Sequence, residues 1–363
     1  MNILHLSSER TWRGGEQQVA NLITASVALG ITCHCAVRKG SAFEAYCKQH
    51  NIPCLSVSFA NEFDVFTALK IKKYCKQHSI DILHMHSSHS HAMGVWSHLL
   101  GNPAVLVLSR RVDFPVKRNW FSRFKFNYKG IKAIICVSEA IKNILAKDLT
   151  NTDHCYVAHS GIDLSRFEGA QRIDLYGLYD IPRERKIVAN ISAVAGHKDY
   201  YTFIATAEQL ILKEHKLHFL IIGDGPLFED IKKHIYQKKL ESHITMTGFK
   251  ENIPSFLKSI DLFLMTSKTE GLGTTLLDAF ANHVPVVATA AGGIPEIVEH
   301  EKTGLLAEVK DVNQLTAHVE RILGDPDFSV RLTTAAYQKL MEHFTIKKMA
   351  EKNVDIYKKA LKK

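Results

Sequence analysis

Short apolar runs rich in β-branched residues alternate along the chain with longer segments whose apolar positions recur at helical spacing. Segments of the second kind in the first half include GEQQVANLITASVALG and FTALKIKKYCKQHS. The runs predicted as strands in the same half are NILHL, TCHCAV, CLSVS, DILHMH, AVLVLS, AIICVS and CYVAH. Strands that alternate with helices predict a parallel sheet with helices on both of its faces.

The second half repeats this scheme after an interruption. The apolar rhythm is lost over residues 167–185, which predicts a linker between an N-terminal domain of residues 1–166 and a C-terminal domain of residues 186–345. The strands predicted after the linker are KIVANISAV, LHFLIIGDG, ITMTG, LFLMTS, PVVATA and GLLAEV. We therefore expect an α/β protein with two doubly wound, Rossmann-like domains that face each other across a cleft. Ligands are expected at the carboxyl ends of the strands.

The last segment, residues 346–363, has the pattern of a helix with one apolar edge. It carries seven lysines. Its apolar edge predicts a packing contact, and we expect this helix to pack back on the N-terminal domain. The residues of the edge are Ile346, Met349, Val354, Tyr357 and Leu361.

Composition places the chain among globular proteins. Of its 363 residues, 46% are hydrophobic and 23% are charged, and no apolar run approaches the roughly 20 residues that cross a bilayer. The opening MNILHLSSERTWRGG lacks the pattern of a secretory signal and reads as a buried first strand. Seven scattered cysteines, an odd number, argue against a disulfide framework and for a reducing cytoplasm.

Charge is distributed unevenly between the two halves. Residues 1–166 contain 20 lysines and arginines against 11 aspartates and glutamates, whereas residues 167–363 contain 26 of each. The whole net charge of +9 therefore belongs to the first half. This asymmetry indicates an anionic partner for that half, which leaves phospholipid, phosphorylated glycolipid and nucleic acid open.

The stretch TEGLGTTLLDAF predicts a ligand site between a strand and a helix. Gly271 and Gly273 allow a ligand to approach the backbone closely, and a helix that starts near Gly273 or Thr274 offers unsatisfied N–H groups to a phosphate. Glu270 and Asp278 would repel a phosphate, so their expected partners are hydroxyl groups. A nucleotide sugar supplies a diphosphate and two polyols. The alternative is a common glycine turn in which the acids only complement the helix dipole.

The longer block SKTEGLGTTLLDAFANHVPVVATAAGGIPEIVEHEKTGLL resembles the signature of family-4 retaining glycosyltransferases of the GT-B fold. That signature is an acid-x7-acid motif, a proline-led strand and a Gly-Gly loop. Further stretches resemble the family in the same order, so the resemblance covers nearly the whole chain. They are RGGEQQVANL, HSGIDLSRF, GHKDYYTFIATA, IIGDGPLFEDIKK and TGFKENIPSFLKSIDLFLMTS.

The resemblance implies roles for individual residues. Glu270 matches the acid that contacts hydroxyls of the transferred sugar, Asp278 the acid that holds the ribose diol, and Lys198 the phosphate-binding lysine. Gly14 and Gly15 match a glycine loop whose backbone meets the donor diphosphate from the opposite domain. Further donor-binding candidates from the matching stretches are Gly225, Gly271, Gly273 and Thr274.

Three positions depart from the family pattern. The second acid is Asp278 rather than glutamate, Ser192 stands where an arginine is common, and His283 replaces the usual glycine before the proline-led strand. The first two leave the nucleotide preference and the donor affinity open.

The implied chemistry is transfer of a sugar from its nucleotide to a hydroxyl group with retention of anomeric configuration. The transition state resembles an oxocarbenium ion, and negative charge grows on the departing diphosphate. Lys198 and the helix start near Thr274 are expected to stabilise that charge. The family implies no cofactor and no required divalent metal.

Four histidines, His84, His86, His89 and His91, lie within eight residues of each other. A zinc site is disfavoured, because only Asp81 at the start of the segment adds an acid. By resemblance, His86 matches a histidine near the donor sugar, which makes it a candidate for positioning or proton handling. The alternative is a hydrogen-bonded core histidine.

The stretch SRRVDFPVKRNWFSRFKFNYKG holds seven cations and one acid among aromatic residues. Helical spacing predicts one aromatic face, which suits an anionic membrane surface or a phosphorylated lipid acceptor. Nucleic acid is the less favoured partner, because no nucleic-acid motif accompanies the stretch. Alternatively, the aromatic residues are core and the lysines form a solvated edge. The residues predicted to share the face are Trp120, Phe121, Phe124 and Tyr128.

Arg110 and Arg111 end the predicted strand AVLVLS and are candidates for binding an anionic acceptor group. Together these observations predict a glycosyltransferase of lipopolysaccharide or other cell-envelope glycan synthesis. We expect it in the cytoplasm, in peripheral contact with the inner face of the membrane through its basic N-terminal half. A nucleotide-sugar epimerase of the same architecture and a non-catalytic nucleotide-sugar-binding protein are the alternatives.

Overall fold

The computed structural model describes residues 1–116 and 119–363. The chain forms two compact units. Unit 1 comprises Met1–Gly161 together with Thr345–Lys363, and unit 2 comprises Ile162–Phe344. Lys117 and Arg118, two of the seven cations in the stretch at residues 109–130, lie outside the described residues.

Unit 1 is built on a seven-stranded parallel sheet in the order β3-β2-β1-β4-β5-β6-β7. Each strand overlaps one of the apolar runs from which it was predicted. The strands are β1 Asn2–Ser7, β2 Thr32–Arg38, β3 Cys54–Val57, β4 Ile82–Met85, β5 Val105–Arg110, β6 Ile131–Cys136 and β7 Cys155–Val157.

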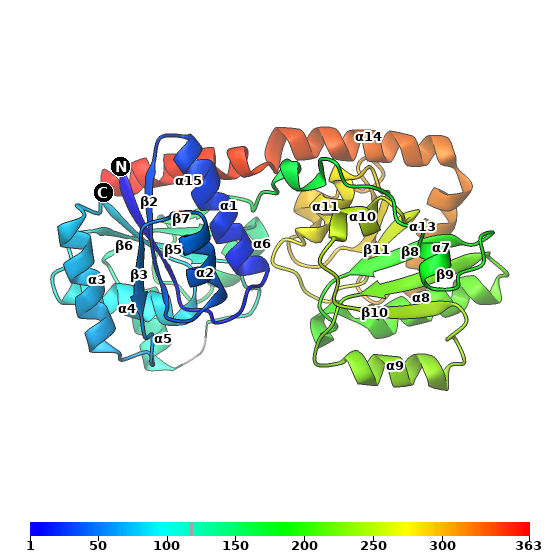
Figure 1. Cartoon of the computed structure of the whole chain (residues 1–363), viewed down its shortest axis with the longest axis horizontal. Coiled ribbons are helices and arrows are strands. Elements are labelled where there is room, and N and C mark those ends of the chain that lie inside the picture. Colours follow the sequence, from blue (N-terminus) through cyan, green and yellow to red (C-terminus); the bar gives the residue numbers. More distant parts are fainter. Residues whose placement is uncertain (117–118) are drawn as a thin grey trace. The chain divides into compact units, whose positions relative to one another are not determined.

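Helices connect these strands and cover the sheet (Figure 1). Helix α15 lies alongside α1 and packs on β5 and β6, whereas α3 lies alongside α4, which packs on β4 and β5. The helices are α1 Gly14–Ala28, α2 Ala42–Gln49, α3 Val65–Gln77, α4 Ser88–Leu99, α5 Trp120–Phe126, α6 Glu139–Ala146 and α15 Ile346–Leu361.

Unit 2 contains a six-stranded parallel sheet in the order β10-β9-β8-β11-β12-β13. Its strands are β8 Lys186–Ile191, β9 Leu217–Ile222, β10 Ile244–Gly248, β11 Leu262–Met265, β12 Val286–Thr289 and β13 Leu305–Ala307. Its longer helices are α8 Tyr200–Leu212, α9 Phe228–Gln237, α13 Val312–Gly324 and α14 Pro326–His343. Its short helical segments are η1 Leu164–Phe167, α7 Leu175–Leu178, η2 Gly196–Lys198, α10 Ile253–Leu257, α11 Thr275–Ala281 and α12 Ile294–Ile297. The predicted fold class of two doubly wound α/β domains is confirmed.

The segment 167–185, expected as a linker, is attached to unit 2. The Nε of Arg172 donates a hydrogen bond to the carbonyl of Lys258 at 2.7 Å, and the N–H of Ile173 donates to the hydroxyl of Ser259 at 2.8 Å. The polar character that interrupts the apolar rhythm therefore reflects a surface segment held by hydrogen bonds.

Helix α15 supplies core residues to unit 1. Val354, Ile356, Tyr357 and Ala360 are buried in one apolar cluster with strand residues of β1, β4, β5 and β6. The predicted apolar edge is wrong for Leu361, which is 43% exposed. Met349 and Ala350 of the same helix are buried against α1.

The strand order places a switch point in each sheet, where the connections on either side run in opposite directions. In unit 1 the switch point lies between β1 and β4, and in unit 2 between β8 and β11. Ligands of doubly wound sheets bind beyond the carboxyl ends of the strands at such points. None of the helices that the structure describes is both long enough and apolar enough to cross a bilayer.

Candidate active site

The carboxyl ends of β8 and β11 bring Lys198 and Glu270 together. Lys198 ends the η2 turn after β8, and Glu270 follows β11. Their side chains, 13% and 10% exposed, form an ion pair, and the hydroxyl of Ser267 donates to Glu270 Oε1 at 2.8 Å. Two residues 72 positions apart, each predicted to bind a different part of a nucleotide sugar, thus form one charged centre at the switch point.

Hydrogen bonds fix the loops that carry this ion pair. The hydroxyl of Thr266 donates to the carbonyls of Lys198 and Asp199 at 3.2 and 3.1 Å. The N–H of Lys268 donates to the carbonyl of His197 at 2.7 Å, and Thr289 Oγ1 donates to the carbonyl of Ser267 at 2.6 Å. The ends of β8, β11 and β12 are therefore bonded to each other, so the charged pair is held before any ligand binds.

The Gly-Gly loop after β12 holds the backbone of Glu270. Gly292 has a φ of +55°, and a Cβ atom there would lie 2.1 Å from the carbonyl oxygen of Glu270. The N–H of Gly293 donates to that same oxygen at 3.0 Å. A side chain at position 292 would displace Glu270, which explains the glycine. A close backbone contact also explains the glycine at position 225, since a Cβ atom on Gly225 would lie 2.5 Å from the carbonyl oxygen of Val194.

The helix after the glycine turn begins at Thr275, next to the predicted start, and Thr274 is its N-cap. Gly273 has a φ of +85°, and Gly271 precedes it in the turn. Two N–H groups of the first turn are already used, because Leu276 donates to the Gly273 carbonyl and Leu277 to the Thr274 carbonyl, both at 3.0 Å. The helix start therefore offers fewer free donors than the sequence pattern implied, which makes the cation Lys198 more important for binding a diphosphate.

Asp278 lies one turn inside α11. Its Oδ1 atom is shielded from solvent and has no hydrogen-bond partner in the described parts of the chain. Burial raises the pKa of Asp278 to about 6, although Arg166 acts in the opposite direction. A shielded carboxylate oxygen without a donor is suited to accept a hydrogen bond from a ligand hydroxyl.

Ser192, which stands where the resemblance expects an arginine, belongs to a neutral network. Its hydroxyl donates to Asn190 Oδ1 and shares a hydrogen bond with Tyr200 OH, both at 2.9 Å. A second cation comes instead from Lys268, whose Nζ lies 3.3 Å from Asp199 Oδ1. Sequence reasoning missed Lys268 and Ser267, although both belong to the quoted SKTEG segment.

In unit 1 two of the four neighbouring histidines form a cluster with a histidine from another strand. His5, from β1, joins His84 and His86, with 3.0 Å between His5 Nδ1 and His86 Nε2. His91 points away and donates from Nε2 to the carbonyl of Lys125 at 2.9 Å. His5 could not be assigned to the cluster from sequence, because it pairs with His84 only through the β1–β4 register.

The rings of this histidine cluster are neutral, and a guanidinium interacts with all three of them. Burial, with a further contribution from Arg111, lowers the pKa of His5 to about 3 and the pKa values of His84 and His86 well below the usual 6.5. Their ring nitrogens lie within 4.8 Å of one another. However, His84 shares hydrogen bonds with Tyr357 OH at 2.7 Å and with Ser109 Oγ at 2.8 Å, so both its nitrogens are used. The neighbouring guanidinium would also repel a cation.

Gly14 and Gly15 are the first two residues of α1, where a loop was expected. The Glu16 side chain stabilises this helix start by accepting the N–H of Arg13 at 3.1 Å. A Cβ atom at either glycine would meet nothing within 4 Å. No contact with the described part of the chain therefore requires glycine at these positions, which is consistent with the close approach of a ligand.

The two candidate arginines after β5 have different surroundings. Arg110 donates a hydrogen bond to the carbonyl of Phe114, and its guanidinium stacks 5.4 Å from the ring centres of Phe114 and Phe126. The Nε of Arg111 is shielded from solvent and has no hydrogen-bond partner among residues 1–116 and 119–363.

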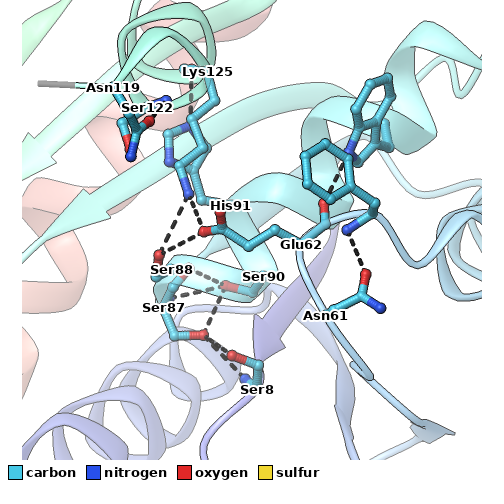
Figure 2. Close-up of polar contacts among 12 residues, drawn as sticks. Ser8, Asn61, Glu62, Ser87, Ser88, Ser90, His91, Asn119, Ser122 and Lys125 are labelled. Carbon is cyan, nitrogen blue, oxygen red and sulfur yellow. Dashed lines mark hydrogen bonds and ion pairs between the residues drawn. The ribbon is translucent and has the colours of Figure 1, made fainter. Parts of the chain in front are cut away.

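The predicted aromatic face on α5 is wrong for two of its members. Phe121 is buried, and Tyr128 lies beyond the end of the helix, where its hydroxyl bonds His98 at 2.8 Å. Trp120 and Phe124 remain exposed. Figure 2 shows the buried Lys125 of α5 pointing to Glu62, its ion-pair partner at 2.6 Å, so one of the predicted surface cations is structural.

Comparison with known proteins gives matches over both units. A family model described as Glycosyltransferase Family 4 matches residues 12–166, and one described as Glycosyl transferases group 1 matches residues 179–339. The chain is 25% identical over 301 residues to N-acetyl-alpha-D-glucosaminyl L-malate synthase of Bacillus anthracis, covering 81% of this chain and 79% of that protein.

A second relative is the UDP-Gal:alpha-D-GlcNAc-diphosphoundecaprenol alpha-1,3-galactosyltransferase of Escherichia coli. It is 25% identical over 322 residues, covering 84% of this chain and 82% of the relative. Among solved structures, Anabaena Alr3699/HepE in complex with UDP and glucose superposes with a TM-score of 0.81 at 17% identity, covering 97% and 98% of the two chains.

Proposed function

The chain belongs to the group 1 and family 4 glycosyltransferases, and from this premise we propose that it moves a sugar from a nucleoside-diphosphate sugar to a hydroxyl group of a cell-envelope glycan or glycolipid. The observation that carries the proposal is the Lys198–Glu270 pair at the unit 2 switch point. Lys198 is suited to bind a diphosphate, and Glu270 is suited to bind sugar hydroxyls.

In the proposed reaction Lys198 stabilises the charge that grows on the departing diphosphate. Its Nζ already lies in a partly buried, hydrogen-bonded site, so little reorganisation is needed when the bond to the sugar breaks. Glu270 accepts hydrogen bonds from the hydroxyls of the transferred sugar, and Asp278 accepts them from the ribose. We propose that the reaction retains the anomeric configuration. We also propose that side-chain cations provide the positive charge that a divalent metal supplies in metal-dependent enzymes.

His86 is assigned a positioning role in this mechanism. Because its pKa lies well below 6.5, the imidazole is neutral and a weak base at pH 7. It is therefore suited to hold a hydroxyl by hydrogen bonding and poorly suited to remove a proton.

A panel of nucleotides tests the function. Thermal unfolding in the presence of UDP, GDP, ADP and their sugar derivatives should show a rise in melting temperature for one nucleotide family, because a ligand that binds the folded state stabilises it. Lys198→Ala should lose that rise. Incubating the enzyme with the preferred donor alone, and then with the donor and a glycolipid extract, distinguishes a transferase from an epimerase. An epimerase changes the donor without an acceptor, whereas a transferase requires one. If no nucleotide raises the melting temperature, the proposed function is wrong.

We further propose that unit 1 contacts an anionic membrane, where lipopolysaccharide or another envelope glycan would be extended on the inner face. With the residues of α15 included, unit 1 contains 26 lysines and arginines against 12 acids, and unit 2 contains 20 against 25. The positive charge is thus concentrated further by the fold, because the lysine-rich C-terminal helix joins the basic unit.

Exposed apolar side chains accompany this charge on α3 and α5. Phe66 is 80% exposed on α3 and Trp120 is 73% exposed on α5. The two helices are linked through Phe63, whose ring centre lies 4.8 Å from that of Phe121. Exposed cations on the same helices include Lys70, Lys73, Lys76 and Arg123. Apolar side chains ringed by lysines are typical of a surface that enters the headgroup region of an anionic bilayer.

Vesicle sedimentation tests this contact. The protein should bind phosphatidylglycerol-containing vesicles at low salt and release at high salt, because the attraction is screened. The double change Phe66→Ser and Trp120→Ser should weaken binding by about tenfold or more, the effect of losing one to two buried apolar side chains. Phe249→Ser in unit 2, at a residue 72% exposed, is the matched control and should bind like the wild type. Equal loss in both variants would contradict the proposal.

A further inference from the structure

Arg111 is a cation at the carboxyl edge of the unit 1 sheet, and it has no ion-pair partner among the described residues. It follows β5 directly, and its Nε is shielded from solvent without a hydrogen-bond partner within the described chain. No ion pair joins it to any described residue, whereas its neighbour Arg110 has a carbonyl and two aromatic rings as partners. The lack of hydrogen-bond and ion-pair partners in the described chain thus distinguishes Arg111 from Arg110.

The groups that interact electrostatically with Arg111 include three histidines, Tyr357 and the acid Glu16. His5, His84 and His86 are neutral because burial lowers their pKa values, and Arg111 itself adds to this effect. Glu16 forms no ion pair with Arg111; its carboxylate instead caps α1 by accepting the N–H of Arg13, and burial raises its pKa. Burial correspondingly lowers the pKa of Arg111 to about 10, so the side chain remains charged at pH 7.

Two further polar atoms of the same cluster also lack partners. His86 Nδ1 and His5 Nε2 are shielded from solvent without hydrogen bonds to the described residues. Shielded polar atoms in folded proteins normally have partners, and an unpaired charge is the most costly exception. A guanidinium nitrogen without a partner, together with two such nitrogens on histidines that interact electrostatically with it, indicates a place for a ligand that carries negative charge.

We propose that Arg111, assisted by His86, binds an anionic group of the acceptor, a phosphate or a carboxylate, and that the enzyme thereby selects negatively charged acceptors. This inference rests on the proposed transferase function and adds the chemical class of its acceptor. A guanidinium binds either group through two parallel hydrogen bonds. Two of the relatives described above have names that contain such groups, a malate and a diphosphate-linked lipid.

A neutral acceptor would leave the guanidinium unpaired in the complex. A site built around a polar group rejects ligands that lack its partner, because the group loses water without gaining a bond.

The unpaired guanidinium also predicts a property of the enzyme without ligand. Replacing Arg111 by methionine, which has similar length and no charge, should raise the melting temperature by about 2–4 °C, because it removes an unpaired charge.

Thermal unfolding of four variants tests the inference with inorganic phosphate, inorganic pyrophosphate and L-malate as probes, against sodium chloride at equal ionic strength. Lys198→Ala serves as the background, so that anions bound at the donor site do not contribute. In this background at least one probe should raise the melting temperature by a few degrees more than chloride does. Adding Arg111→Met should abolish that rise, whereas adding Arg110→Met should retain it while lowering the melting temperature of the free protein.

Binding of the nucleoside diphosphate identified by the thermal panel to Arg111→Met alone distinguishes the acceptor from the donor as the source of the anion. An unchanged response to this nucleotide supports an acceptor group, whereas a lost response assigns Arg111 to the donor diphosphate and overturns the inference. It is also overturned if the probes act no differently from chloride, or if Arg111→Met retains their effect. Failure of the wild type to respond to every nucleotide of the panel would instead refute the proposed function, which keeps the two results separate.

Discussion

Replacing Glu270 by alanine is expected to lower the rate of sugar transfer by a factor on the order of 10²–10³, the cost of losing one preorganised polar contact to the reacting group. The carboxylate holds Lys198 and receives the Ser267 hydroxyl, and its backbone is fixed by Gly293. A group held this firmly is positioned for the transition state before the substrate arrives, so its loss should appear in kcat.

Binding of the nucleoside diphosphate should survive the same change. Without Glu270, the ammonium of Lys198 has lost its partner and is free to interact with phosphate, so the affinity for the diphosphate should stay equal or increase. Calorimetry with the nucleotide found in the thermal panel measures this, together with steady-state transfer rates. Glu208→Gln is the control, since that acid forms an exposed ion pair with Lys238. Equal losses of transfer and of nucleotide affinity would show that Glu270 is structural.

Replacing Tyr357 by alanine is expected to lower the free energy of unfolding of unit 1 by about 3–5 kcal/mol, the usual cost of removing a buried aromatic side chain. Tyr357 is fully buried among residues of β1, β4, β5 and β6, and its hydroxyl bonds His84 at 2.7 Å. Tyr357→Phe should cost about 1–3 kcal/mol, because it keeps the ring but leaves a nitrogen of His84 without its partner.

Leu361→Ala provides the matched control on the same helix. Its side chain is exposed, so the free energy of unfolding should change by less than about 0.5 kcal/mol. Urea unfolding followed by tryptophan fluorescence is the suitable measurement, because Trp12, Trp96 and Trp120 all belong to unit 1. If Tyr357→Ala unfolds at the wild-type urea concentration, α15 is not part of the unit 1 core.

The placement of individual site residues was predictable where a local pattern determines it. Each strand of both sheets coincides with an apolar run, and Lys198 and Glu270 both follow such runs directly. Since parallel strands end at one edge of their sheet, these two residues were expected at the same edge. Their direct ion pair was not predictable, because it depends on β8 and β11 being neighbours, which the sheet order alone specifies.

The errors of the sequence interpretation also arise from contacts with residues that lie elsewhere in the chain. Phe121 and Trp120 were placed on one face by helical spacing, but only Phe121 reaches the ring of Phe63, which comes from another part of the chain. Spacing could not separate Arg110 from Arg111 either, because the aromatic rings that contact Arg110 come from Phe114 and Phe126.

The sequence by itself determined the two α/β sheets, the family motifs and the chemical kind of the donor site, since apolar periodicity and short motifs are local properties of the chain. Only the tertiary structure decided that His5 joins His84 and His86, that the lysine-rich α15 belongs to the basic unit, and that Arg111 Nε has no hydrogen-bond partner among the described residues. These are contacts between residues distant in sequence, or the lack of such contacts. They depend on strand order and packing, which no local pattern encodes.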